Sequence, residues 1–69
     1  MTQKECLYVE DAIGHEQTII KVIEETCNKL EEEELIEYMN NEIKTHQKME
    51  KELKKELEVN SHEWSSING

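Results

Sequence analysis

The sequence predicts an all-α fold, an antiparallel two-helix hairpin that homodimerises into a four-helix bundle. Apolar residues recur at helical spacing through most of the chain, and the chain contains no proline. The apolar spacing breaks phase once, near Leu30–Leu35. One straight helix cannot bury both halves of this pattern on the same side, so the pattern indicates two helices joined by a turn.

The first helix is expected over about residues 3–30. Thr2 is followed three residues later by Glu5, which is the spacing of a capping box at a helix start. The residues of the first stripe follow a 3-4 spacing: Cys6, Val9, Ile13, Glu16, Ile20, Ile23, Cys27 and Leu30. Since further apolar residues flank this stripe, the helix is expected to contact two neighbours in a bundle.

The turn is expected over about residues 31–34, and the second helix over about 34–58. The second stripe comprises Ile36, Met39, Ile43, His46, Glu50, Leu53 and Leu57. A continuous helix from Thr2 to about Glu58 is the alternative. Residues 1–59 therefore make up the hairpin, and 60–69 are expected to form a polar, frayed tail. In that tail, Trp64 is expected either to cover an apolar end or to contact a partner.

A hairpin of 69 residues buries too little apolar surface to offset its ordering entropy, so a second copy is the expected partner. The formal net charge is −9 and every basic residue is lysine, which argues against nucleic acid. No apolar run reaches the roughly 20 residues of a membrane span. We therefore expect no membrane partner and a cytoplasmic location, with the spore as an alternative.

The two cysteines lie roughly 30 Å apart along one predicted helix, which is too far for a disulfide within the chain. They are interpreted as reduced core thiols. If two first helices pack antiparallel, however, Cys6 of one chain meets Cys27 of the other, and an intermolecular bond becomes the alternative.

Ionisable residues interrupt both stripes at the middle of the predicted bundle. In the hairpin, Glu16 is expected to face Glu50, and Ile20 to face His46. Glu42 and Glu50 each lie one helical turn from His46, so the three side chains share a face. Two facing carboxylates require a proton, a bridging His46, water or a cation. The layer is interpreted as a polar core layer that fixes register; the alternative is an iron or zinc site on Glu16, His46, and Glu50 or Glu42.

Two segments carry a family resemblance: LYVEDAIGHEQTI in the first helix and IEYMNNEIKTHQKM in the second. They resemble small helical proteins of spore-forming bacteria that are related to spore-coat and ferritin-like families. The ferritin-like families imply a four-helix bundle with a Glu on one helix and Glu-x-x-His on the next. Glu16 matches the first of these and His46 the second, but Ile43 stands where that motif has its Glu.

The sequence thus favours a structural or protein-interaction module associated with sporulation rather than an enzyme. The first alternative is a metal-binding ferritin-like protein. The second is a regulatory adaptor that docks a helix onto a signalling protein.

Overall fold

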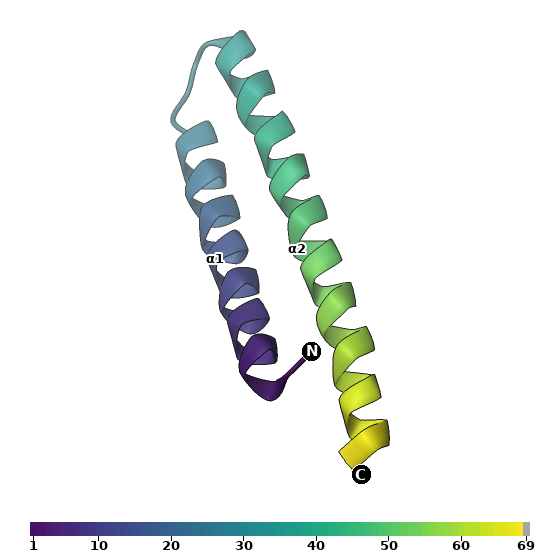
Figure 1. The fold of residues 1–69 in the computed structure, drawn as a ribbon. Coiled ribbons are helices and arrows are strands. Elements are labelled where there is room, and N and C mark those ends of the chain that lie inside the picture. The colour runs from purple at the N-terminus through teal and green to yellow at the C-terminus, as the bar shows by residue number, and fades with distance from the viewer. Residues whose placement is uncertain (69) are drawn as a thin grey trace.

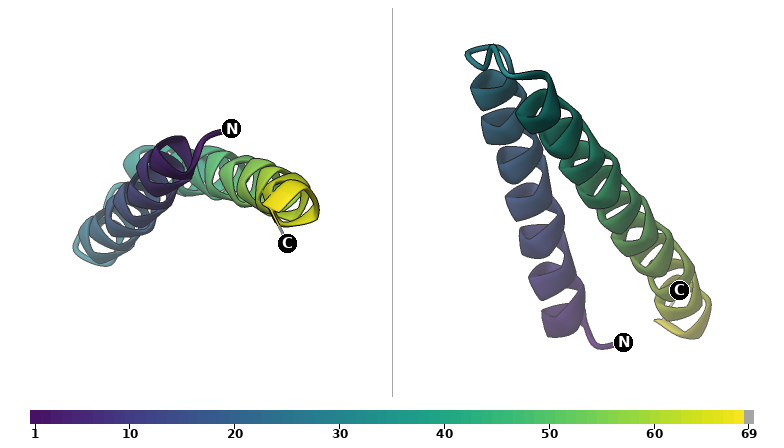
Figure 2. Two further views of the ribbon diagram at one scale, coloured as in Figure 1. Left: turned by 60° about the horizontal axis from the view of Figure 1, so that its bottom comes forward. Right: turned by 90° about the horizontal axis from the view of Figure 1, so that it is seen from above.

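The structure, a computed structural model, describes the backbone of residues 1–68 and the side chains of residues 1–60. Helix α1 spans Gln3–Cys27 and helix α2 spans Glu33–Asn68. The two helices lie side by side and antiparallel, joined by a short turn (Figures 1 and 2). The molecule is a thin rod, 53 × 14 × 12 Å. The predicted all-α hairpin is confirmed, and the alternative of one continuous helix is wrong.

The start of α1 is fixed by the predicted capping box. The Glu5 backbone N–H donates to Thr2 Oγ1 at 3.1 Å, and the Thr2 N–H donates to Glu5 Oε1 at 2.8 Å. These bonds satisfy N–H groups that have no partner within the helix. The bond from the Thr2 N–H stabilises the charged Glu5 carboxylate and is the largest cause of the lowered pKa of Glu5.

Replacing Thr2 with alanine is expected to lower the free energy of unfolding by about 1 kcal/mol, because it removes the acceptor that caps α1. Urea denaturation followed by circular dichroism measures this change. Thr18→Ala serves as the control, since Thr18 donates only to a carbonyl within its own helix. An equal loss of unfolding free energy in both variants would contradict a specific stabilising role of the cap.

Helix α1 ends at Cys27, earlier than the predicted end near residue 30. The Lys29 N–H donates to the Thr26 carbonyl at 3.0 Å, and the Leu30 N–H donates to the Cys27 carbonyl at 3.2 Å. These three-residue bonds tighten the chain and end the α-helical ladder. No described residue has a positive φ, so the turn is made without a left-handed residue.

Helix α2 begins at Glu33, close to its predicted start, and continues to Asn68. The residues expected to form a separate tail from 60 onward therefore belong to this helix as far as Asn68. The prediction for Trp64 concerns a side chain outside the described ones.

The contact between the helices, here called the seam, contains the predicted stripes. Ile13 and Ile20 are the buried hydrophobic residues of the described part, with 8% and 9% exposed, and Glu16 is buried among them at 9%. The other members of both stripes are half-buried: Cys6, Val9, Ile23, Cys27, Leu30, Ile36, Met39, Ile43, His46, Glu50, Leu53 and Leu57. The hairpin therefore has a narrow core with little fully enclosed apolar surface.

Candidate functional site

A polar cluster crosses the middle of the seam. The ring of His46 on α2 lies between two carboxylates: its Nδ1 is 2.6 Å from Glu16 Oε2 on α1, and its Nε2 is 3.9 Å from Glu42 Oε2. Because an ionised carboxylate only accepts, an ionised Glu16 accepts this bond from the His46 Nδ1–H. Glu42 contacts the same ring from one turn earlier on α2, as the spacing predicts. A doubly protonated His46 would interact favourably with both carboxylates.

Glu50 belongs to a second network on the other side of the seam. Gln17 Nε2 donates to Glu50 Oε2 at 2.9 Å, and Lys54 Nζ lies 3.0 Å from the same oxygen. The bond from Lys54 is the largest cause of the lowered pKa of Glu50, and the bond from Gln17 is the next. Both donors stabilise the charged carboxylate.

The predicted pairing of Glu16 with Glu50 is therefore wrong. Glu16 faces His46, and Glu50 faces its neighbour Gln17. This arrangement gives each carboxylate a donor across the seam instead of a second acceptor, which avoids two facing negative charges. Sequence reasoning missed Gln17 because this residue lies at the margin of the apolar stripe. The requirement for a hydrogen-bond donor opposite the Glu50 carboxylate could have pointed to it.

The donors of the cluster do not converge on one point. The ring of His46 presents Nδ1 to Glu16 and Nε2 to Glu42, whereas a metal centre needs three or more donors directed at the ion. Glu50, the remaining predicted ligand, is held by Gln17 and Lys54. Among the described residues, no group of three His, Cys, Asp or Glu side chains is placed to hold a metal ion. The iron or zinc site stays a prediction.

Both cysteines are free thiols. Cys27 lies in the seam, where its Sγ is 3.8 Å from Asn40 Oδ1 on α2. The interpretation of Cys6 and Cys27 as reduced core thiols stays a prediction, as does the intermolecular bond.

Large apolar side chains also lie exposed on the outside of the hairpin. Successive residues of an α-helix are rotated by about 100° around its axis. By this rotation, one group of apolar residues on α1 and one on α2 lie roughly a quarter turn from the seam. Because the helices are antiparallel, both groups fall on the same broad side. We call this side the apolar face; its exposed members are Tyr8 and Ile19 of α1 and Leu35, Tyr38 and Met49 of α2, and the small, half-buried Ala12 lies among them.

The opposite side of the hairpin, here called the polar face, has a different composition. Helical periodicity places there the Gln17, Glu50 and Lys54 network and the lysines Lys21, Lys44 and Lys51. The hairpin is thus two-sided, with an apolar and a polar face on either side of the seam.

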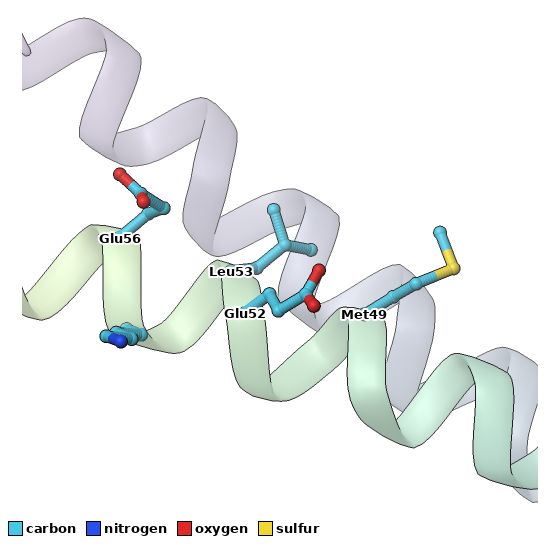
Figure 3. Close-up of a pocket in the computed structure, with 5 residues that line it drawn as sticks. Met49, Glu52, Leu53 and Glu56 are labelled. Atoms are coloured by element: carbon cyan, nitrogen blue, oxygen red, sulfur yellow. The ribbon is translucent and has the colours of Figure 1, made fainter.

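A shallow hollow lies beside Met49 at the border of the apolar face. Its volume is ≈ 510 Å³, and its lining residues all come from α2: Met49, Glu52, Leu53, Lys55 and Glu56. Figure 3 shows Met49, Leu53 and Glu56 projecting from one side of this helix. A hollow lined by one helix has no opposite wall, so it does not enclose a small molecule.

Neither helix, over the described residues, combines the length and the apolar content needed to cross a membrane.

Glutamine in place of Glu50 is expected to lower the free energy of unfolding at pH 7 and to flatten its decline in acid. A lowered pKa means that the folded state binds its proton less readily than the unfolded chain. The stabilisation is therefore present above the ordinary pKa of 4.5 and is lost as the pH falls through the lowered value. Urea titrations between pH 3 and pH 7 measure it. The control is Glu58→Gln, at an exposed position on the same helix; equal pH profiles for the two variants would contradict the assignment.

Comparisons with known proteins find no match among protein-family models, curated proteins or solved structures. The resemblance to spore-coat and ferritin-like proteins thus depends on the two quoted sequence segments alone.

Proposed function

We propose that this protein is a small structural or protein-interaction module that works as a homodimeric four-helix bundle. The carrying observation is the apolar face. The hairpin buries two hydrophobic residues in its described part, Ile13 and Ile20, while Tyr8, Tyr38 and Leu35 are 59%, 59% and 44% exposed. An exposed contiguous apolar surface is typical of a protein-interaction site.

The exposed area supports the same proposal. The accessible surface is 5628 Å² for a chain of 8.2 kDa. A compact monomer of that mass exposes about 4,500 Å². The difference, about 1,100 Å², is similar to the roughly 800 Å² that each partner buries in a standard interface. One partner of the size of this hairpin would thus bring the chain to ordinary compactness.

A second copy is the partner that we propose for this face. Each hairpin offers one apolar face with residues from both helices, and two such faces pressed together give a bundle with one continuous core. Helical periodicity also places Lys4, Glu42, Glu52 and Glu56 on this side, between and beyond the apolar members, whereas the other lysines lie elsewhere. A self-complementary face of this kind is what a two-fold dimer requires.

The proposed role is structural rather than catalytic, and the resemblance supports an association with sporulation. Across the seam, the described polar side chains are bonded to one another: Glu16 to His46, and Gln17 to Glu50. Such a layer supports the proposal as a device that sets the register of helices in a bundle.

Native mass spectrometry of protein purified without chelator tests this function, with spectra recorded before and after addition of iron(II) or zinc. The expected species is a dimer whose mass is unchanged by either ion. A folded monomer at micromolar concentration would overturn the proposal. One or two metal ions retained per two chains would favour the metal-binding alternative, and a co-purified heterologous protein would favour the adaptor.

A further inference from the structure

We propose that the second copy docks on the apolar face with its turn at the same end of the molecule, about a two-fold axis that runs along the rod. This inference rests on the proposed homodimer and specifies how its two chains meet. In the resulting bundle, α1 of each chain packs on α2 of the other. Every helix then has two antiparallel neighbours, one from its own chain and one from the partner.

Two-fold symmetry allows two ways of pressing the same face of two hairpins together. An axis along the rod keeps both turns at one end and places α1 on α2 of the partner. An axis across the rod reverses one hairpin, separates the two turns, and places α1 on α1 and α2 on α2. The two dimers therefore differ in the residues that face each other across the interface.

An axis along the rod also fixes the register, because the rotation leaves the height of every residue along the rod unchanged. Residues that are level across the seam therefore also meet across the interface. Two seam contacts give these levels: Gln17 lies opposite Glu50, and Cys27 lies opposite Asn40, with the same total of residue numbers in both pairs. The third seam bond, in the polar cluster, joins residues little more than one helical turn from these levels. The facing residues of the dimer are thus known to within about one turn.

Apolar residues of the two chains meet at two levels of this interface. Ile19 lies opposite Met49 of the partner subunit near the middle of the apolar face. Tyr8 lies opposite the partner's Val59 near the open end, at the edge of the face. All four side chains are exposed in the single hairpin. Since the axis forms each pair twice, the dimer removes four such contacts from water at once.

A polar pair of complementary character lies between these two apolar levels. His15 lies opposite Glu52 of the partner subunit, and both side chains are exposed in the single hairpin. The neutral ring donates one N–H to a carboxylate, and the protonated ring adds the attraction of opposite charges. An exposed pair of this kind adds little affinity, but it favours the register that forms it.

Glu42 lies diagonally across the axis from its own copy, and each of these two carboxylates has donors beside it. The His46 Nε2 of the same chain is 3.9 Å from Glu42 Oε2, and a doubly protonated ring donates there. The hydroxyl of Thr26 of the partner subunit lies opposite Glu42 on the facing helix. The two carboxylates are therefore paired with donors rather than with each other.

An axis across the rod brings carboxylates together instead. With this axis at Met49, near the middle of the apolar face, Glu42 and Glu56 lie two turns on either side of it. Each then lies opposite the other residue of the partner subunit, and the pair forms twice inside the interface. In the proposed arrangement, Glu56 faces the small Ala12 of the partner subunit and Glu42 faces Thr26. Because facing carboxylates oppose association, the axis along the rod is favoured.

The acidic turns come together at one end of the proposed dimer. The four glutamates at 31–34 are all exposed, so water and salt screen the repulsion between the two turns. A carboxylate pair inside an interface is screened much less. The turns therefore oppose the proposed arrangement less than facing Glu42 and Glu56 oppose the alternative.

Cross-linking between two single-cysteine variants tests the arrangement. In a background of Cys6→Ala and Cys27→Ala, one chain carries Ile19→Cys and a second, mass-tagged chain carries Met49→Cys. The two are unfolded together in urea, refolded as a mixture and oxidised with copper phenanthroline. The expected result is a covalent heterodimer as the main cross-linked band on a non-reducing gel, reversed by dithiothreitol.

Each variant oxidised alone serves as the control. Neither is expected to give a covalent dimer, because two copies of one position lie on diagonal helices, too far apart for a disulfide. A second mixture, of Tyr8→Cys with tagged Val59→Cys, repeats the test at the open end and does not alter the middle of the face. Circular dichroism and native mass spectrometry establish that each variant stays helical and dimeric.

The outcomes separate the arrangement from the proposed function. A covalent dimer formed by Met49→Cys alone places the axis across the rod, which overturns the arrangement and leaves the homodimer standing. Native dimers that cross-link in neither mixture overturn it as well. A wild-type protein that is a helical monomer overturns both the arrangement and the proposed function.

Discussion

Replacing Ile19 with glutamate is expected to convert the dimer into monomers at micromolar concentration. Ile19 lies near the middle of the apolar face, and a dimer formed through this face contains the new carboxylate twice. A charge buried without a partner costs about 3–5 kcal/mol, which corresponds to a dissociation constant raised by more than a hundredfold. Sedimentation equilibrium of the variant beside the wild-type protein measures this loss.

Leu7→Glu is the matched control for this experiment. Leu7 also lies on α1 and is 56% exposed, against 38% for Ile19, but helical periodicity places it away from the apolar face. The control variant is expected to dimerise as the wild-type protein does. Equal weakening by both substitutions would show that added negative charge, rather than loss of the apolar face, is responsible.

The second large effect is expected from removing the polar layer. Glu16→Leu combined with His46→Leu should raise the free energy of unfolding by about 1–4 kcal/mol, because replacing a buried polar or charged pair with well-packed apolar residues often increases stability. The two single substitutions together should give a smaller gain in the free energy of unfolding than the double variant. Each of them leaves the remaining side chain, Glu16 at 12% exposed or His46 at 21% exposed, without its bond across the seam. A double-mutant cycle in urea at pH 7 measures the coupling.

The pair Gln17→Leu and Glu50→Leu is the control for this cycle. It also breaks a bond across the seam, but on the polar face, where Glu50 interacts with Lys54 as well. We expect the control pair to lower stability, because it removes Glu50 together with its interactions with Lys54 and Gln17, which hold the pKa of that carboxylate down. A Glu16 and His46 double variant that is less stable than the wild-type protein would contradict the interpretation of this layer as a register device.

Much of the hairpin could be predicted from the sequence because helix formation is local. The spacing of Ile13, Glu16 and Ile20 gave the buried side of α1, and Thr2 with Glu5 gave its start. The helix ends were harder to predict. No glycine or proline marks the end of α1, and the polar residues after Asn60 continue the backbone ladder without contributing to the stripe.

The site was predicted in part for a related reason. The spacing of Glu42 and His46 within one helix correctly placed them beside each other. Which residue of α1 meets His46 depends on the length of the turn and on how the helices cross, and periodicity does not supply either. The prediction that Glu16 faces Glu50 was therefore wrong: Glu16 bonds to His46, and its neighbour Gln17 bonds to Glu50.

The most direct measurement of the homodimer is sedimentation equilibrium of the wild-type protein over a range of micromolar concentrations, with thermal unfolding recorded on the same samples. The apolar face predicts a mass twice the 8.2 kDa of one chain and a melting temperature that rises with concentration. A helical 8.2 kDa monomer with a melting temperature independent of concentration would contradict it.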